Sequence, residues 1–114
     1  MDESGKGIKI ITGGVTAARG FKAASTAAGI KYKDRQDMAM IYSQEPCRSA
    51  GTFTTNIVKA APVKWDKNQV TSGAPARAVV INAGIANACT GEEGMGYCGQ
   101  TAEAAALALG ISAE

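Results

Sequence analysis

Polar side chains and glycines are concentrated in residues 82–94, NAGIANACTGEEG, where an apolar run gives way to a helical pattern. The segment offers the side chains of Asn82, Asn87 and Thr90, together with backbone N–H groups at the start of the expected helix. Such groups can bind a carboxylate or stabilise a developing oxyanion. The same residues can cap a turn, with Gly84 supplying backbone freedom. On the residues alone, turn capping is the simpler interpretation.

A second candidate site is GMGYCG at residues 94–99, which matches the dinucleotide-binding pattern GxGxxG. That pattern binds a pyrophosphate only where its first glycine directly follows a strand and a second strand ends in an acidic residue. Here the preceding strand is expected to end near Asn82, and no second strand follows. A nucleotide- or phosphate-binding module that uses residues 91–99 is kept as the alternative function.

Nucleophilic and metal-binding residues are few. The sequence has no histidine, so Ser-His-Asp and Cys-His catalysis within the chain and the commonest zinc ligand are excluded. Its three cysteines, Cys47, Cys89 and Cys98, contain no CxxC pair, and we interpret them as reduced thiols that pack as small apolar residues. Thr54 and Thr55 have no visible activating base. No metal site is predicted.

Size and composition indicate one domain-sized segment, residues 1–114, that needs a partner or more polypeptide for stability. The chain is 46% hydrophobic but only 5% aromatic, so large core side chains are scarce. A net charge of +2 does not favour nucleic-acid binding. Apolar runs are far shorter than the ~20 residues of a membrane helix, and no signal peptide is recognisable. We expect a cytoplasmic protein without a membrane or nucleic-acid partner.

Several strands are predicted in the first half of the chain. Residues 1–14 are expected to form a short mobile or edge segment, and residues 31–37 a charged turn. Pattern and composition favour strands at 20–30, at 38–43 and, because of its threonines, at 49–56. Glu45-Pro46 is expected to end the second of these, since proline cannot donate to a ladder.

The second half alternates helix and strand. A short helix is predicted over residues 59–70, beginning near Pro62, and a buried strand over 76–82. Apolar residues at helical spacing predict a final helix that ends at Gly110: Met95, Cys98, Ala102, Ala105 and Leu109. The chain is therefore predicted to be mixed α/β (α+β).

The start of this final helix is predicted in more detail. Thr90 and Glu93 fit a capping box, in which each side chain bonds to the other's backbone N–H. Gly94, Gly96 and Gly99 each weaken a helix by ~1 kcal/mol relative to alanine. Regular helix is therefore expected only from near Tyr97, with a flexible entrance before it.

Three stretches together resemble one enzyme family: GFKAASTAAGIK, GTFTTNIVKAAPV and VVINAGIANACTGEEG. They are similar to the N-terminal region of the bifunctional ornithine acetyltransferases, also called glutamate N-acetyltransferases, of arginine biosynthesis. FTTN, AAPV and NACTG in this order make the resemblance specific. It implies a layered α/β/β/α sandwich resembling the N-terminal-nucleophile hydrolases.

The resemblance also implies a multifunctional acyltransferase that cleaves its own backbone into an α-chain and a β-chain. The N-terminal threonine of the β-chain would take an acetyl group from N-acetylornithine and pass it to glutamate. Its own α-amino group, with a pKa of ~7.7–8.0, can serve as the general base. The lack of histidine is consistent with this chemistry.

By the same resemblance, the nucleophilic threonine and the oxyanion-hole Thr-Gly pair lie C-terminal to Glu114, so no catalytic residue is expected in this chain. Residues 1–114 correspond to the N-terminal portion of the α-chain. Its expected partners are the remaining α-chain segment and the β-chain, in a hetero-oligomer of αβ units. No cofactor is expected, and use of acetyl-CoA as a donor is left open. Asn82, Gly84 and Asn87 are predicted to line or support the active site.

Overall fold

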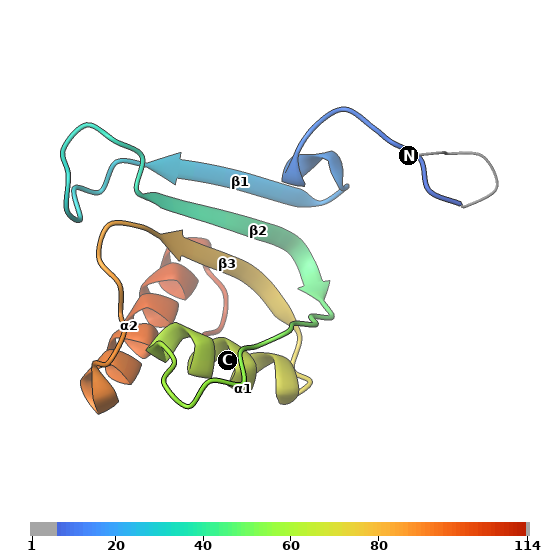
Figure 1. The fold of residues 1–114 in the computed structure, drawn as a ribbon. Helices are drawn as coiled ribbons and strands as arrows, with labels where there is room; N and C mark the ends of the chain where they lie inside the picture. The colour runs from blue at the N-terminus through green and yellow to red at the C-terminus, as the bar shows by residue number, and fades with distance from the viewer. Residues whose placement is uncertain (1–6, 114) are drawn as a thin grey trace.

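The computed structural model describes residues 7–113 as a three-stranded antiparallel sheet with both helices on one side of it (Figure 1). The strands pair in the order β1-β2-β3, with β2 in the middle. The elements, in chain order, are a 3₁₀ turn at Val15–Ala17, β1 Phe21–Thr26, β2 Met38–Cys47, α1 Ala61–Thr71, β3 Ala76–Asn82 and α2 Gly91–Leu109. The predicted α+β class is confirmed.

Strand β2 is longer than expected, because it continues through Glu45-Pro46 instead of ending there. Its pairing with β3 is interrupted between Tyr42 and Cys47, so Pro46 lies at an irregularity where a missing N–H is tolerated. The side chain of Arg77 fills part of this gap: its Nε donates to Ser43 O at 3.3 Å and its guanidinium donates to Tyr42 Oη at 2.6 Å.

The strand predicted at 49–56 is absent, and that prediction was wrong. Residues 48–60 run from β2 to α1 without regular secondary structure. The threonine-rich composition suits a strand, but both edges of β2 are already paired, with β1 on one side and β3 on the other. Asn56 N donates instead to Thr54 Oγ1 at 3.2 Å, so the FTTN motif forms a local turn.

Helix α1 agrees with the prediction, with Pro62 in its first turn. Helix α2 begins at Gly91 and not near Tyr97, so the prediction of a flexible entrance over 90–96 was wrong. Its five predicted inward residues are all half-buried. The helix ends as predicted: Gly110 has a left-handed φ of 68°, and Ile111 N donates to Ala106 O at 3.0 Å.

Within residues 7–113, neither α-helix covers one of the two faces of the sheet. Register pairs Ile81 with Ala39 and Val79 with Ile41, and β1 adds Ala23 and Ser25 to the same face. These six residues define the open face: Ala23, Ser25, Ala39, Ile41, Val79 and Ile81. Val79 is 55% exposed and Ile81 47% exposed, whereas the alternating Ala78 and Val80 are half-buried. The strand at 76–82 is thus confirmed as a strand, but it is buried on one side only.

The described residues are loosely packed for their number. Among them, the buried apolar side chains are those of Ala61, 6% exposed, and Ala106, 7% exposed, and no large side chain is fully buried. The radius of gyration is 16.3 Å, compared with roughly 13 Å expected for a compact domain of this length. The described residues therefore bury little apolar surface among themselves.

The N-terminal prediction is tested only in part. Residues 1–6 lie outside the described residues, and residues 7–14 form no strand. The exposed side chains in this stretch include Ile8, Ile10 and Ile11. In residues 7–113, neither helix is long and apolar enough to cross a membrane.

Candidate strand-exit site

The candidate site is the turn that joins β3 to α2. Strand β3 ends at Asn82, and α2 begins at Gly91. In Figure 1 this turn and the loop between β1 and β2 leave the sheet at the same end. The two segments are joined by a hydrogen bond of 2.9 Å from Ala83 N to Asp37 O. The predicted site residues therefore lie at one edge of the molecule, next to the loop at 27–36.

Asn87 is fully engaged within the turn. Its Nδ2 donates to Gly94 O at 2.9 Å, and its Oδ1 accepts a hydrogen bond from the Thr90 hydroxyl. Its backbone O accepts from Ala61 N at 3.1 Å, at the start of α1. The half-buried Asn87 thus ties the starts of both helices together. In these contacts Asn87 supports the turn, as the capping interpretation expects.

Asn82 and Gly84 are placed differently. Asn82 is exposed at the end of β3, and its side-chain amide makes no hydrogen bond within residues 7–113. Gly84 has a φ of +109°, which L side chains rarely adopt. A Cβ at this position would also lie 3.2 Å from the Cβ of Lys31. The turn therefore carries the exposed side-chain amide of Asn82, and two residues later its backbone passes close to Lys31.

Asp37 is the buried group at this end of the sheet, and it was predicted only as part of a charged turn. Its side chain is 8% exposed. Oδ1 accepts from Ala28 N at 2.6 Å and Oδ2 accepts from Ile30 N at 2.9 Å. These backbone donors, that of Ala28 first, hold the pKa of Asp37 below its ordinary value of 3.8. The sequence feature that could have drawn attention to Asp37 is its position: it follows a loop that contains a glycine and directly precedes a strand.

Asp37 is expected to make the protein more stable above its unfolded-state pKa than below it. Because its folded pKa is lowered, its contribution is complete above about pH 4–5 and is lost as pH falls through the folded value. Thermal unfolding of wild type and Asp37→Asn between pH 7 and pH 3 would measure this. We expect a difference in Tm that is constant near neutrality and shrinks in acid. A difference that does not change with pH would contradict an ionised Asp37 as its source.

The predicted capping box does not form, and that prediction was wrong. Thr90 is the residue before α2, but its side chain makes no capping hydrogen bond to the helix and bonds to Asn87 instead. Glu93 accepts a hydrogen bond from the Tyr97 hydroxyl. With Glu92 and Glu93 in the first turn, an anion approaching this helix terminus would meet two carboxylates. The terminus by itself is therefore a poor site for a substrate carboxylate.

The GMGYCG stretch does not form a phosphate-binding loop. All of residues 94–99 lie inside α2, and eight residues separate its start at Gly91 from the end of β3. Gly99 faces α1 instead, since a Cβ there would lie 3.7 Å from the indole of Trp65. The nucleotide-binding alternative is therefore not supported.

The three cysteines are free thiols. Cys47 Sγ lies 3.0 Å from Ser43 Oγ, and Cys89 is exposed in the turn. Burial raises the pKa of the half-buried Cys98 thiol, with a further contribution from the charge of Asp66. Within residues 7–113 no three Cys, Asp or Glu side chains gather closely enough to hold a metal ion. The raised pKa disfavours the thiolate form of Cys98, so this thiol is not activated as a nucleophile.

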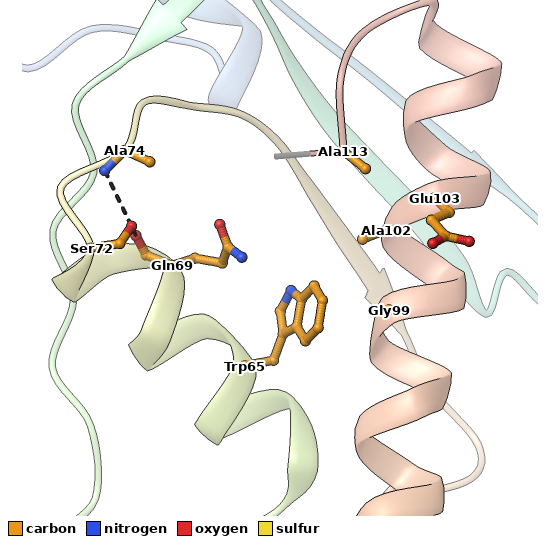
Figure 2. Close-up of a pocket in the computed structure, with 8 residues that line it drawn as sticks. All are labelled: Trp65, Gln69, Ser72, Ala74, Gly99, Ala102, Glu103 and Ala113. Carbon is orange, nitrogen blue, oxygen red and sulfur yellow. Dashed lines mark hydrogen bonds between the residues drawn. The ribbon is translucent and has the colours of Figure 1, made fainter.

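A shallow groove of about 410 Å³ lies between the helices, away from the strand exit. Figure 2 shows the Trp65 indole and the Gln69 side chain of α1 facing α2 across it. Ser72 Oγ accepts a hydrogen bond of 3.2 Å from Ala74 N at its rim. Sequence reasoning did not predict this groove, because it depends on how the two helices pack. Of the residues singled out from the sequence as candidate sites, Gly99 of the GMGYCG stretch lines it, whereas Asn82, Gly84 and Asn87 do not.

Comparison with known proteins decides the family. A model of the ArgJ family matches residues 22–114. The chain belongs to the ArgJ family. Over 104 residues it is 48% identical to the arginine biosynthesis bifunctional protein ArgJ of Gloeobacter violaceus, which covers 91% of this chain and 26% of that protein. Over 97 residues it is 52% identical to ArgJ of Mycolicibacterium paratuberculosis, covering 84% of this chain and 24% of that protein. The chain thus spans about a quarter of the length of these curated relatives.

Solved ArgJ structures share the fold. The arginine biosynthesis bifunctional protein ArgJ of Bacillus halodurans matches with a TM-score of 0.82 and 35% identity, over 89% of this chain and 52% of that chain. The ornithine acetyltransferase of Mycobacterium tuberculosis, solved in complex with ornithine, matches with a TM-score of 0.80 and 50% identity, over 85% of this chain and 50% of that chain. The predicted family is confirmed, and the FTTN, AAPV and NACTG motifs all lie within the matched range.

Proposed function

We propose that this ArgJ chain is the N-terminal part of the α-chain of an enzyme that moves acetyl from N-acetylornithine to glutamate. The observation that carries the proposal is the match, at 50% identity, to an ornithine acetyltransferase solved with ornithine. Ornithine is the product that remains when N-acetylornithine gives up its acetyl group. The proposal covers the remaining α-chain segment and a β-chain as partners, in a cytoplasmic hetero-oligomer of αβ units.

The nucleophile in this proposal is the N-terminal threonine of the β-chain. Its hydroxyl oxygen attacks the acetyl carbonyl of N-acetylornithine, its own α-amino group takes the hydroxyl proton, and the ornithine amine leaves with a proton. The glutamate amine then attacks the acetyl-threonine ester and regenerates the hydroxyl. No histidine is needed, which agrees with the composition of this chain. Acetyl-CoA as a second donor would deliver acetyl to the same threonine.

The remaining polypeptide is proposed to complete a layered α/β/β/α sandwich. The open face supports this, because Val79 and Ile81 are exposed on it, whereas Ala78 and Val80, which alternate with them along β3, are half-buried. A second sheet packed there would bury Ile41, Val79 and Ile81. Covering this face would also compensate for the loose packing of the chain.

Asn82, Gly84 and Asn87 are proposed to contribute to the active site in two ways. Asn82 offers an exposed amide to a substrate, whereas Asn87 supports the turn through its contacts with Thr90 and Gly94. Gly84 permits the turn to pass close to Lys31. Because the Asn82 amide is exposed and the Asn87 amide is hydrogen-bonded within the turn, substitutions at the two positions should have different effects, which makes the proposal testable.

We expect Asn82→Ala and Asn87→Ala to separate activity from stability. Asn82→Ala should lower the rate of acetyl transfer with a change in unfolding free energy of less than about 0.5 kcal/mol, as for other exposed sites. Asn87→Ala should cost about 1–3 kcal/mol, because it leaves polar groups of the turn unpaired. Steady-state acetyl transfer and urea denaturation of the complete enzyme measure both. Wild-type rates in Asn82→Ala would remove it from the active site.

The proposed function is tested on the complete protein. We expect this chain to purify with at least one further polypeptide that begins with threonine, which intact mass and N-terminal sequencing would detect. The assembly should transfer isotope-labelled acetyl from N-acetylornithine to glutamate and carry label on that threonine when glutamate is omitted. An assembly that transfers no acetyl between these substrates would refute the proposal.

A further inference from the structure

A single residue joins the strand-exit turn to the loop between β1 and β2. The backbone N of Asp37 donates to Thr26 O at 3.1 Å, where β1 ends, and its backbone O accepts from Ala83 N at 2.9 Å, where β3 ends. Its carboxylate accepts from the backbones of Ala28 and Ile30 inside the loop. Asp37 therefore contacts both neighbouring strands and the loop at the same time.

The turn and the loop also approach each other closely at Gly84. Gly84 passes so close to the loop that a Cβ would lie 3.2 Å from Lys31 Cβ and 3.7 Å from Lys31 N. Because the carboxylate of Asp37 holds Ile30, the residue before Lys31, it sets where the loop meets the turn. A shift of the loop would therefore displace Gly84 or Asn82.

We propose that Asp37 is a positioning residue for acetyl transfer, and that it acts by holding the turn at 82–84 in place against the loop at 27–36. This inference rests on the proposed function. Asp37 is 8% exposed and its two carboxylate oxygens are occupied by backbone donors, so it acts through the turn and does not contact the substrate.

The chemical reason is the sensitivity of group transfer to geometry. A misplacement of about 1 Å in a substrate-positioning group can cost roughly 100-fold in rate. Asn82 directly precedes Ala83, whose N–H is bonded to Asp37, so a small movement of the loop reaches the exposed amide without a change of fold. A role confined to stability would instead lower the fraction of active molecules and leave the KM of the folded enzyme unchanged.

The test is Asp37→Asn in the complete enzyme, with Asp34→Asn as the matched control. Asparagine keeps one acceptor oxygen but faces the other backbone N–H with an amide NH₂ group, so one of the two bonds is lost. Asp34 lies in the same loop, is exposed, and has a φ of 58° that asparagine tolerates. We expect Asp37→Asn to raise KM for N-acetylornithine or glutamate by about tenfold, with Asp34→Asn close to wild type.

Gly84→Ala is the second variant, and it perturbs the same junction from the turn. If Asp37→Asn yields no soluble enzyme, Gly84→Ala decides the question, and a raised KM supports the inference. Where both fold, the double variant should raise KM by less than the product of the single effects, because both act on one contact. Wild-type KM values in the folded variants would overturn the inference while leaving the proposed function intact. An inactive wild-type assembly would instead overturn the proposed function, and the inference with it.

Discussion

Ile81→Asp is expected to prevent stable assembly of the complete enzyme. Ile81 is 47% exposed in this chain and belongs to the open face, which we propose is covered by a second sheet. If that sheet packs there, an aspartate at this position becomes a buried charge without a partner. Such a charge costs about 3–5 kcal/mol, a large part of the stability of an ordinary domain. Size-exclusion chromatography with thermal unfolding, followed by an acetyl-transfer assay, would measure the loss.

Leu107→Asp is the matched control. Leu107 is 85% exposed, more than Ile81, but it lies on α2 and not on the open face. We place it on the solvent side of the helix layer and expect a change of less than about 0.5 kcal/mol. Equal tolerance of both substitutions would contradict a covered open face. Equal loss would indicate that the remaining polypeptide also packs on the helices.

Gly94→Ala should destabilise the protein although it places a better helix former inside α2. A Cβ at this position would lie 2.6 Å from Thr90 Cβ and closer still to the Thr90 hydroxyl and Asn87 Oδ1. Overpacking costs about 1–3 kcal/mol and the displaced hydrogen bonds a further ~1–3 kcal/mol, against a gain in helix propensity of ~1 kcal/mol. The net expectation is a loss of about 1–5 kcal/mol, measured by urea denaturation.

Gly96→Ala isolates the propensity effect. Gly96 lies two residues further along the same helix, and no heavy atom lies within 4 Å of where its Cβ would be. Here the substitution should stabilise the protein by up to about 1 kcal/mol. If Gly94→Ala were also stabilising, the packing of Thr90 and Asn87 over the first turn would be different from that described.

The elements that the sequence predicted correctly are those with a local cause. The helix over 61–71 follows from a proline tolerated in its first turn, and the end of α2 follows from Gly110 in the left-handed region. The strand at 76–82 follows from its apolar run and was predicted with correct bounds. The errors arose where contacts with other segments decide the structure. Residues 49–56 do not pair with β2, whose two edges are taken by β1 and β3, and β2 continues past Pro46 because Cys47 pairs with Ala76.

In the candidate site, too, the features with a local cause were predicted and those that depend on contacts with other residues were not. Residues 82–91 were recognised from their composition, and the motifs alone indicated the ArgJ family. The different environments of the Asn82 and Asn87 side chains were not predictable, because they depend on whether Gly94 and Thr90 come within hydrogen-bond distance. Asp37 was missed for the same reason, since its partners lie on the loop before it and at the end of another strand.

The sequence by itself therefore determined the family, the mixed α+β class and the positions of both helices and of β1 and β3, because spacing, proline and glycine act over a few residues. Only the tertiary structure decided which amide is exposed and which is engaged, which face of the sheet is open, and that Asp37 joins the loop to the turn. These features depend on contacts between residues far apart in the chain, and such contacts form only when the sheet brings β1, β2 and β3 side by side.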